Sequence, residues 1–117
     1  MFYVLINEKG LHIHSANEML TLEQMQNLVG IEAEPAYIEV ASYRSYSDSS
    51  IVMICDDEFL RKGYEPTCRT GEGIVIHGQV LVLGTDKANE DFGLLTLQQT
   101  ELIKRETRLY QQNQLTI

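Results

Sequence analysis

The chain has 117 residues, of which 44% are hydrophobic, and a formal net charge of −8 at pH 7. This length is typical of one domain, and the apolar content suffices for a core without a metal or a disulfide, so we expect a single domain over residues 1–117. The negative charge repels phosphates and disfavours direct binding of nucleic acid.

The charge is unevenly distributed along the chain. Residues 1–60 hold ten acidic and two basic residues, whereas residues 61–117 hold seven of each. An acidic half of this kind either keeps a protein soluble or attracts a basic partner surface.

The sequence favours a cytoplasmic protein without a membrane segment. No apolar run approaches the roughly 18 residues of a membrane span, and the apolar N-terminus lacks the basic region of a signal peptide. Cys55 and Cys68 are separated by twelve residues. We expect free thiols in a reducing compartment, and a single disulfide between them is the alternative.

The first fifteen residues predict a β-hairpin. Residues 2–6 are apolar on both faces, as in a strand buried on both sides. Residues 7–10 end in glycine, which is typical of a tight turn. Residues 11–15 alternate, and we expect two side chains inward (Leu11, Ile13) and two outward (His12, His14).

Two segments predict helices that begin with a capping box. Thr21 and Gln24 mark the start of a short amphipathic helix over residues 21–29. Thr96 and Gln99 repeat the pattern and predict a C-terminal helix from about residue 96. Its apolar side is expected to comprise Leu102, Ile103, Leu109 and Tyr110.

The middle of the chain predicts further strands. Residues 36–43 and 51–55 are rich in β-formers, and the second run is typical of a buried central strand. Residues 61–73 contain several glycines and a proline and predict a long loop. Residues 74–83 predict one strand bent or bulged at His77-Gly78. The chain is therefore expected to be α+β, with a mixed or mainly antiparallel sheet of the hairpin plus three or four further strands.

One set of residues suggests a metal site. His12 and His14 point the same way from a strand, and acidic residues follow the buried strand at Asp56, Asp57 and Glu58. Together they are candidates for a metal-assisted hydrolase, with His77 as a third imidazole. Alternatively, the histidines are the solvated face of an outer strand and the acidic residues solvate a turn.

The loop after Asp56 is the expected ligand-binding region. Cys68 lies beside Arg69, and a neighbouring cation lowers the pKa of a thiol, which makes Cys68 a more reactive candidate than Cys55. The candidate ligand-binding residues are Asp56, Asp57, Glu58, Cys68 and Arg69. No pattern indicates a cofactor.

The ordered motifs resemble the small proteins grouped as domain of unknown function family 3846. Three segments carry the resemblance: residues 22–30 leading into 37–40, residues 51–58 followed by Lys62-Gly63 and Pro66, and residues 76–84. The family pattern has glycine where this chain has Phe59, and asparagine with basic residues where it has residues 67–69. The resemblance implies a bacterial, phage or plasmid protein, and it implies no activity and no catalytic residue.

Three functions follow as hypotheses. The first is a non-enzymatic binding module that recognises a protein or a small ligand through its sheet face or the loop over residues 56–73. The second is the metal-assisted hydrolase. The third is an acidic decoy that presents the carboxylates of residues 1–60 to a basic protein surface. A homodimer through the edge of the first hairpin or the C-terminal helix is a further expectation.

Overall fold

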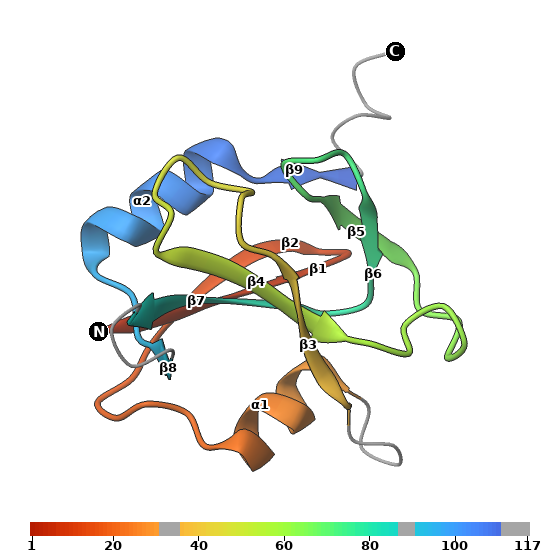
Figure 1. Cartoon of the computed structure of the whole chain (residues 1–117), viewed down its shortest axis with the longest axis horizontal. Helices are drawn as coiled ribbons and strands as arrows, with labels where there is room; N and C mark the ends of the chain where they lie inside the picture. The colour runs from red at the N-terminus through yellow and green to blue at the C-terminus, as the bar shows by residue number, and fades with distance from the viewer. Residues whose placement is uncertain (31–35, 87–90, 111–117) are drawn as a thin grey trace.

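The computed structural model describes residues 1–30, 36–86 and 91–110 and contains two antiparallel sheets (Figure 1). The larger sheet has the order β2-β1-β7-β4-β3, with β8 paired to β7, and the smaller has the order β6-β5-β9. The strands of the larger sheet are β1 (Phe2–Asn7), β2 (Gly10–Ser15), β3 (Ile38–Ser42), β4 (Ile51–Asp56), β7 (Val80–Asp86) and β8 (Asp91–Gly93). Those of the smaller are β5 (Pro66–Arg69), β6 (Val75–His77) and β9 (Arg108–Leu109).

The larger sheet is buried on both faces because apolar residues occupy both sides of its central strands. Alternate β4 residues such as Met53 pack with α2 (Leu97–Glu106) and the smaller sheet, and the residues between them, such as Ile54, pack with α1 (Leu22–Val29). Figure 1 shows the two helices on opposite sides of the sheet. All six residues of β4 are buried, which confirms the predicted central strand.

Both helices begin at the predicted capping boxes. The Thr21 hydroxyl accepts from the Gln24 amide at 3.1 Å, and the Gln24 side chain accepts from the Thr21 amide at 2.8 Å. Thr96 and Gln99 make the same pair of hydrogen bonds, at 3.1 and 2.9 Å. The α+β prediction is confirmed, with the short helix at Leu22–Val29 and the C-terminal helix at Leu97–Glu106.

Three local predictions were wrong. The segment predicted as a loop over residues 61–73 contains β5, which pairs with β6 and β9. The apolar stretch over residues 74–83 is two strands in different sheets, because Gly78 at φ +82° lets the chain turn between β6 and β7. The C-terminal helix ends at Glu106, and Leu109 belongs to β9.

The N-terminal hairpin is confirmed, and its second strand lies at an edge. β2 pairs with β1 through the whole register from Asn7↔Gly10 to Phe2↔Ser15. His12 and His14 are exposed as predicted, but Ile13 is 37% exposed because β2 lies at the margin of the core. Neither helix in the described residues has the length and apolar character that a membrane crossing requires.

Candidate functional site

The carboxylate of Asp56 is turned into the protein. Asp56 is 1% exposed, and the ammonium of Lys62 lies 2.7 Å from its Oδ2. The Tyr64 hydroxyl donates to the same oxygen at 3.2 Å, and the Glu58 amide donates to Oδ1 at 3.0 Å. A carboxylate with these partners holds its own loop in place.

The other two acidic residues of the run face outward. Asp57 is exposed, and the half-buried Glu58 forms a salt bridge with the exposed Arg61 three residues further along the chain. The three neighbouring acidic residues therefore have three different surroundings, and Asp57 is the most accessible of them.

The loop over residues 57–65 is fastened to the bend between β6 and β7. The rings of Phe59 and His77 stack at 5.4 Å, and Nδ1 of His77 donates to the carbonyl of Tyr64 at 2.8 Å. The Tyr64 ring lies so close to Gly78 that a Cβ at this position would overlap Cδ2 of the ring. We call these four residues the loop anchor, and His77 serves in it as a structural contact.

The predicted metal ligands are not brought together. His12 and His14 are on β2, and Asp56 ends β4, which lies three strands away and hence about 14 Å across the sheet. The described residues contain no group of three or more His, Cys, Asp or Glu side chains that could hold a metal ion. This geometry does not support a hydrolase that joins these two regions.

The two cysteines are free thiols in the core. Cys55 and Cys68 are 1% and 0% exposed, and burial raises the pKa of each thiol to about 12. The predicted lowering of the Cys68 pKa by Arg69 is wrong: burial of the thiol raises its pKa, and adjacent strand residues such as Cys68 and Arg69 point to opposite faces. The Arg69 guanidinium lies over the ring of Tyr110 at 5.6 Å.

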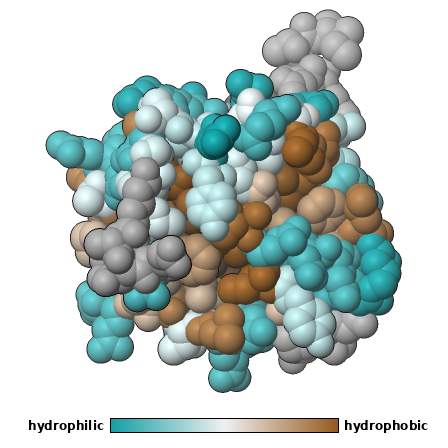
Figure 2. Space-filling model, in the orientation of Figure 1, coloured by the Kyte–Doolittle hydropathy of each residue, from teal (hydrophilic) through white to brown (hydrophobic). Residues whose placement is uncertain are grey.

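The described acidic residues of the first half are spread over separate elements. Glu8 is in the hairpin turn, Glu23 is on α1 and Glu39 is on β3, and all three are exposed. On the face shown in Figure 2, hydrophilic side chains lie mainly around the margin, and hydrophobic residues gather through the middle. The decoy hypothesis, which requires an acidic surface that binds a basic partner, stays a prediction.

The structure shows a surface groove that the sequence did not predict. Three neighbouring hollows share wall residues and follow one another past the β1–β2 turn; together we call them the turn groove. The first, of about 230 Å³, is lined by Glu8, Val29, Gly30, Tyr64, Glu65, Gly78 and Gln79. The second, of about 110 Å³, is lined by Asn7, Glu8, Lys9, Gly10, Thr67 and Leu109. The third, of about 170 Å³, is lined by Leu11, Lys104, Thr107 and Leu109.

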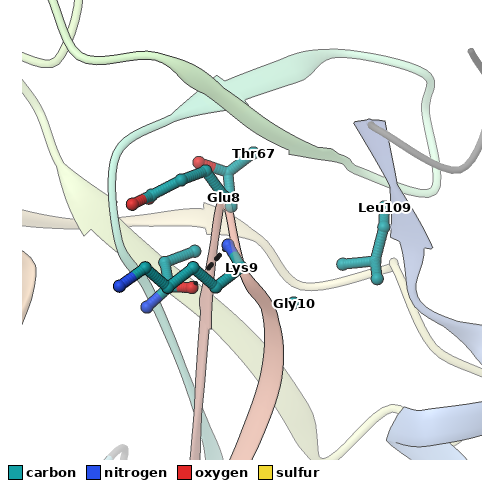
Figure 3. A pocket seen from close by; sticks show the side chains of 6 residues that line it. Glu8, Lys9, Gly10, Thr67 and Leu109 are labelled. Carbon is teal, nitrogen blue, oxygen red and sulfur yellow. Dashed lines mark hydrogen bonds between the residues drawn. The ribbon is translucent and has the colours of Figure 1, made fainter.

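The middle of the turn groove joins three segments that are far apart in the sequence. Figure 3 shows the hairpin turn with Glu8 and Lys9, and Thr67 of β5 and Leu109 of β9 across from it. The turn is held by a hydrogen bond from the Lys9 amide to Asn7 Oδ1 at 2.9 Å, and Gly10 closes it at φ +119°. The Thr67 hydroxyl donates to the Gly78 carbonyl at 2.5 Å, which ties β5 to the β6–β7 bend.

The walls of the turn groove carry charges of opposite sign at its two ends. Glu8 and Glu65 line the first hollow, and Lys104 lines the third. The groups with shifted pKa lie outside it: besides the thiols, burial raises the pKa of Tyr46, and hydrogen bonds from Ser47 lower that of Glu106. A shifted titratable group inside a cleft is the usual mark of a catalytic site, and these four groups do not provide one.

Comparison with known proteins identifies the family. The family model described as Domain of unknown function (DUF3846) matches residues 1–109, so the chain belongs to this family, as its motifs indicated. No curated protein and no solved structure matches the chain.

Proposed function

We propose that this member of the DUF3846 family is a non-enzymatic binding module that holds an extended peptide segment of a protein partner in the turn groove. The observation that carries the proposal is the adjacency of the three hollows: Glu8 lines both the first and the second, and Leu109 lines both the second and the third. We place the encounter in the cytoplasm, where free thiols such as Cys55 and Cys68 persist.

The size and shape of the groove favour a peptide over a small molecule. Pockets for small ligands usually enclose about 300–1,000 Å³. The hollows of about 230, 110 and 170 Å³ are each smaller than this, but they are arranged in series. An extended segment fills such a series with successive side chains, whereas a compact ligand occupies one hollow poorly.

The charges on the walls give the segment a direction. A basic side chain is favoured near Glu8 and Glu65, and an acidic one is favoured near Lys104. Between them, the middle hollow is lined by the charged Glu8 and Lys9 and by Leu109, which offers the apolar contact. The expected ligand therefore carries a basic residue toward one end, an apolar residue in the middle and an acidic residue toward the other end.

The hydroxyl nearest the middle of the groove is not arranged as a nucleophile. The single proton of the Thr67 hydroxyl is donated to the Gly78 carbonyl at 2.5 Å, and the Glu65 carbonyl lies 3.3 Å from the same oxygen. A nucleophilic hydroxyl needs a neighbouring base that takes its proton, and a backbone carbonyl is not such a base. This arrangement supports binding without turnover.

A displayed random-peptide library selected on the purified protein tests the proposal. We expect enriched peptides with the charge order given above. Lys104→Glu should weaken their binding about five- to thirtyfold, because reversal replaces one surface attraction with a repulsion. Arg105→Glu is the matched control: it makes the same charge change on the next residue of α2, outside the groove lining.

Two results would contradict the proposal. One is enrichment of peptides whose affinity is equally insensitive to Lys104→Glu and Arg105→Glu. The other is enrichment of no sequence in a library that yields binders for a known peptide-binding domain handled in parallel.

A further inference from the structure

The edge strand β2 carries the features that natural proteins avoid on an exposed edge. Among the described residues it pairs with β1 alone, over six continuous residues and without a register shift. It contains no proline and no lysine, which are the usual protection against edge-to-edge pairing. By contrast, β3 at the opposite edge is interrupted by a register shift between Val40 and Ser42.

The hydrogen-bonding phase of β2 is set by the hairpin turn. Asn7 and Gly10 flank a two-residue turn, and such a flanking pair is hydrogen-bonded. Since hydrogen-bonded and open pairs alternate, the backbone groups of His12 and His14 face β1. Those of Leu11, Ile13 and Ser15 face away from β1, toward the open edge. The Ala16 amide donates to the Met1 carbonyl at 2.9 Å, which continues the same phase.

The two histidines of β2 stand side by side on one face and are held by neighbours on β1. His12 Nε2 lies 3.3 Å from Asn7 Oδ1, and because that oxygen only accepts, Nε2 is the donor. This leaves Nδ1 of a neutral His12 with a free lone pair. The ring of His14 stacks on Tyr3 at 5.0 Å. A histidine that donates one ring nitrogen to an amide oxygen and offers the other is the usual state of a metal ligand.

We propose that two copies of this chain pair antiparallel along β2 and bind a divalent transition-metal ion, such as Zn²⁺, between His12 of one copy and His14 of the other. The two-fold axis passes at Ile13. This register makes the outward-facing Leu11, Ile13 and Ser15 the hydrogen-bonded positions of the new ladder, with about six bonds in total.

The register places the imidazoles where a metal needs them. With Ile13 opposite Ile13 of the second copy, His12 lies opposite His14 of that copy in an open pair. The Cα atoms of such a pair are about 4.5 Å apart, and the side chains lie on the same face. Imidazole nitrogens bind Zn²⁺ at about 2.0–2.1 Å, so two rings at this separation can share one ion. The symmetry repeats the pair, which brings four imidazoles together.

The site is incomplete in one copy. A single chain supplies two imidazoles, and the described residues contain no set of three metal-binding side chains. The edge hydrogen bonds alone are weak support for a dimer, because each exchanges a bond to water for one to protein. Metal binding and strand pairing therefore stabilise each other. Imidazole ligands favour Zn²⁺, Cu²⁺ or Ni²⁺ over Mg²⁺ or Ca²⁺.

Sedimentation velocity of the full chain without a polyhistidine tag tests the proposal. With added ZnCl₂ we expect the mass of a dimer and at least one bound zinc per dimer, and with excess EDTA the mass of a monomer. MgCl₂ should have no effect. An unchanged mass in zinc at protein concentrations up to about 100 µM overturns the proposal.

Variants separate the proposed site from chance chelation. His12→Ala/His14→Ala should remain monomeric in zinc. Ile13→Pro should also remain monomeric, because it removes an outward N–H from the new ladder and none from the β1–β2 ladder. Ile13→Ala, which keeps the N–H, should still dimerise, and circular dichroism should show all variants folded. Zinc-dependent dimers of Ile13→Pro as strong as those of Ile13→Ala would indicate an adventitious ion bridging surface histidines and would overturn the strand pairing.

Discussion

Asp56 ends strand β4 with its carboxylate inside the protein, where three donors reach it. Lys62, Tyr64 and the amide of Glu58 surround it within 3.2 Å. Lys62 is as deeply buried as its partner, with 3% of its side chain exposed. Each charge is stabilised by the other, so the pair fixes the loop over residues 57–65 as long as both members are present.

Loss of the cation should destabilise the protein strongly. Lys62→Met leaves the Asp56 carboxylate buried without its counter-ion, and we expect the free energy of unfolding to fall by about 3–5 kcal/mol. Arg61→Met removes the neighbouring surface salt bridge to Glu58 and should cost about 0–1 kcal/mol. Denaturant unfolding measures both. Equal losses in the two variants would show that the Asp56–Lys62 pair does not have the burial described.

The two thiols should be unreactive in the folded protein. Burial raises the pKa of Cys55 and of Cys68 from 9.0 to about 12. Because the thiolate is the reactive form, its lower population slows labelling at about pH 8 on the order of 1,000-fold relative to the unfolded chain. Reaction with a chromogenic disulfide, with and without denaturant, measures the ratio. Rapid labelling of one thiol under native conditions would revive the hypothesis of a reactive cysteine.

At the scale of elements, the bend between β6 and β7 connects the two sheets. Gly78 adopts φ +82°, and the ring of Tyr64 packs directly on it. The same bend receives the Thr67 hydroxyl from β5 and lies beside the first hollow of the turn groove. Gly78 therefore lets the chain turn from one sheet to the other and provides the surface on which the Tyr64 ring packs.

Two glycine substitutions separate backbone strain from steric overlap. Gly63 also has a positive φ, +71°, but a Cβ added there would meet nothing within 4 Å, so Gly63→Ala should cost about 1–2 kcal/mol. Gly78→Ala adds the overlap with Tyr64 and should cost about 2–5 kcal/mol. If thermal or denaturant unfolding finds the two variants equally stable, Tyr64 does not pack on the bend as described.

The elements that local signals specify are those that the sequence predicted. The capping boxes at Thr21 and Thr96 depend on residues three apart, and the hairpin depends on a turn ending at Gly10. The strand β5 was missed because its pairing partners are remote and its segment contains the breakers Gly63 and Pro66. Non-local pairing outweighed local composition there.

For the whole molecule, the candidate site was predicted in part only. The residues predicted to bind a ligand (Asp56, Asp57, Glu58, Cys68 and Arg69) do not line the turn groove, and from the predicted loop over residues 56–73 its lining includes Tyr64, Glu65 and Thr67. The sequence did not identify the turn groove as a whole, because Lys9, Thr67 and Leu109 come from three distant segments and have no shared motif. The sequence features that could have indicated the groove were the glycines that close turns at Gly10 and Gly78. Each of them indicates a turn, but neither indicates which segment of the chain lies across the groove from that turn.

The turn groove is the proposed binding surface, and amide chemical-shift mapping tests this assignment most directly. A ¹⁵N-labelled sample titrated with the best peptide from the library selection should show its largest shifts at groove residues such as Gly10, Thr67 and Leu109. Amides of β3, on the far edge of the larger sheet, should stay unchanged. Shifts concentrated on β3 or α1, with the groove amides unmoved, would contradict the account.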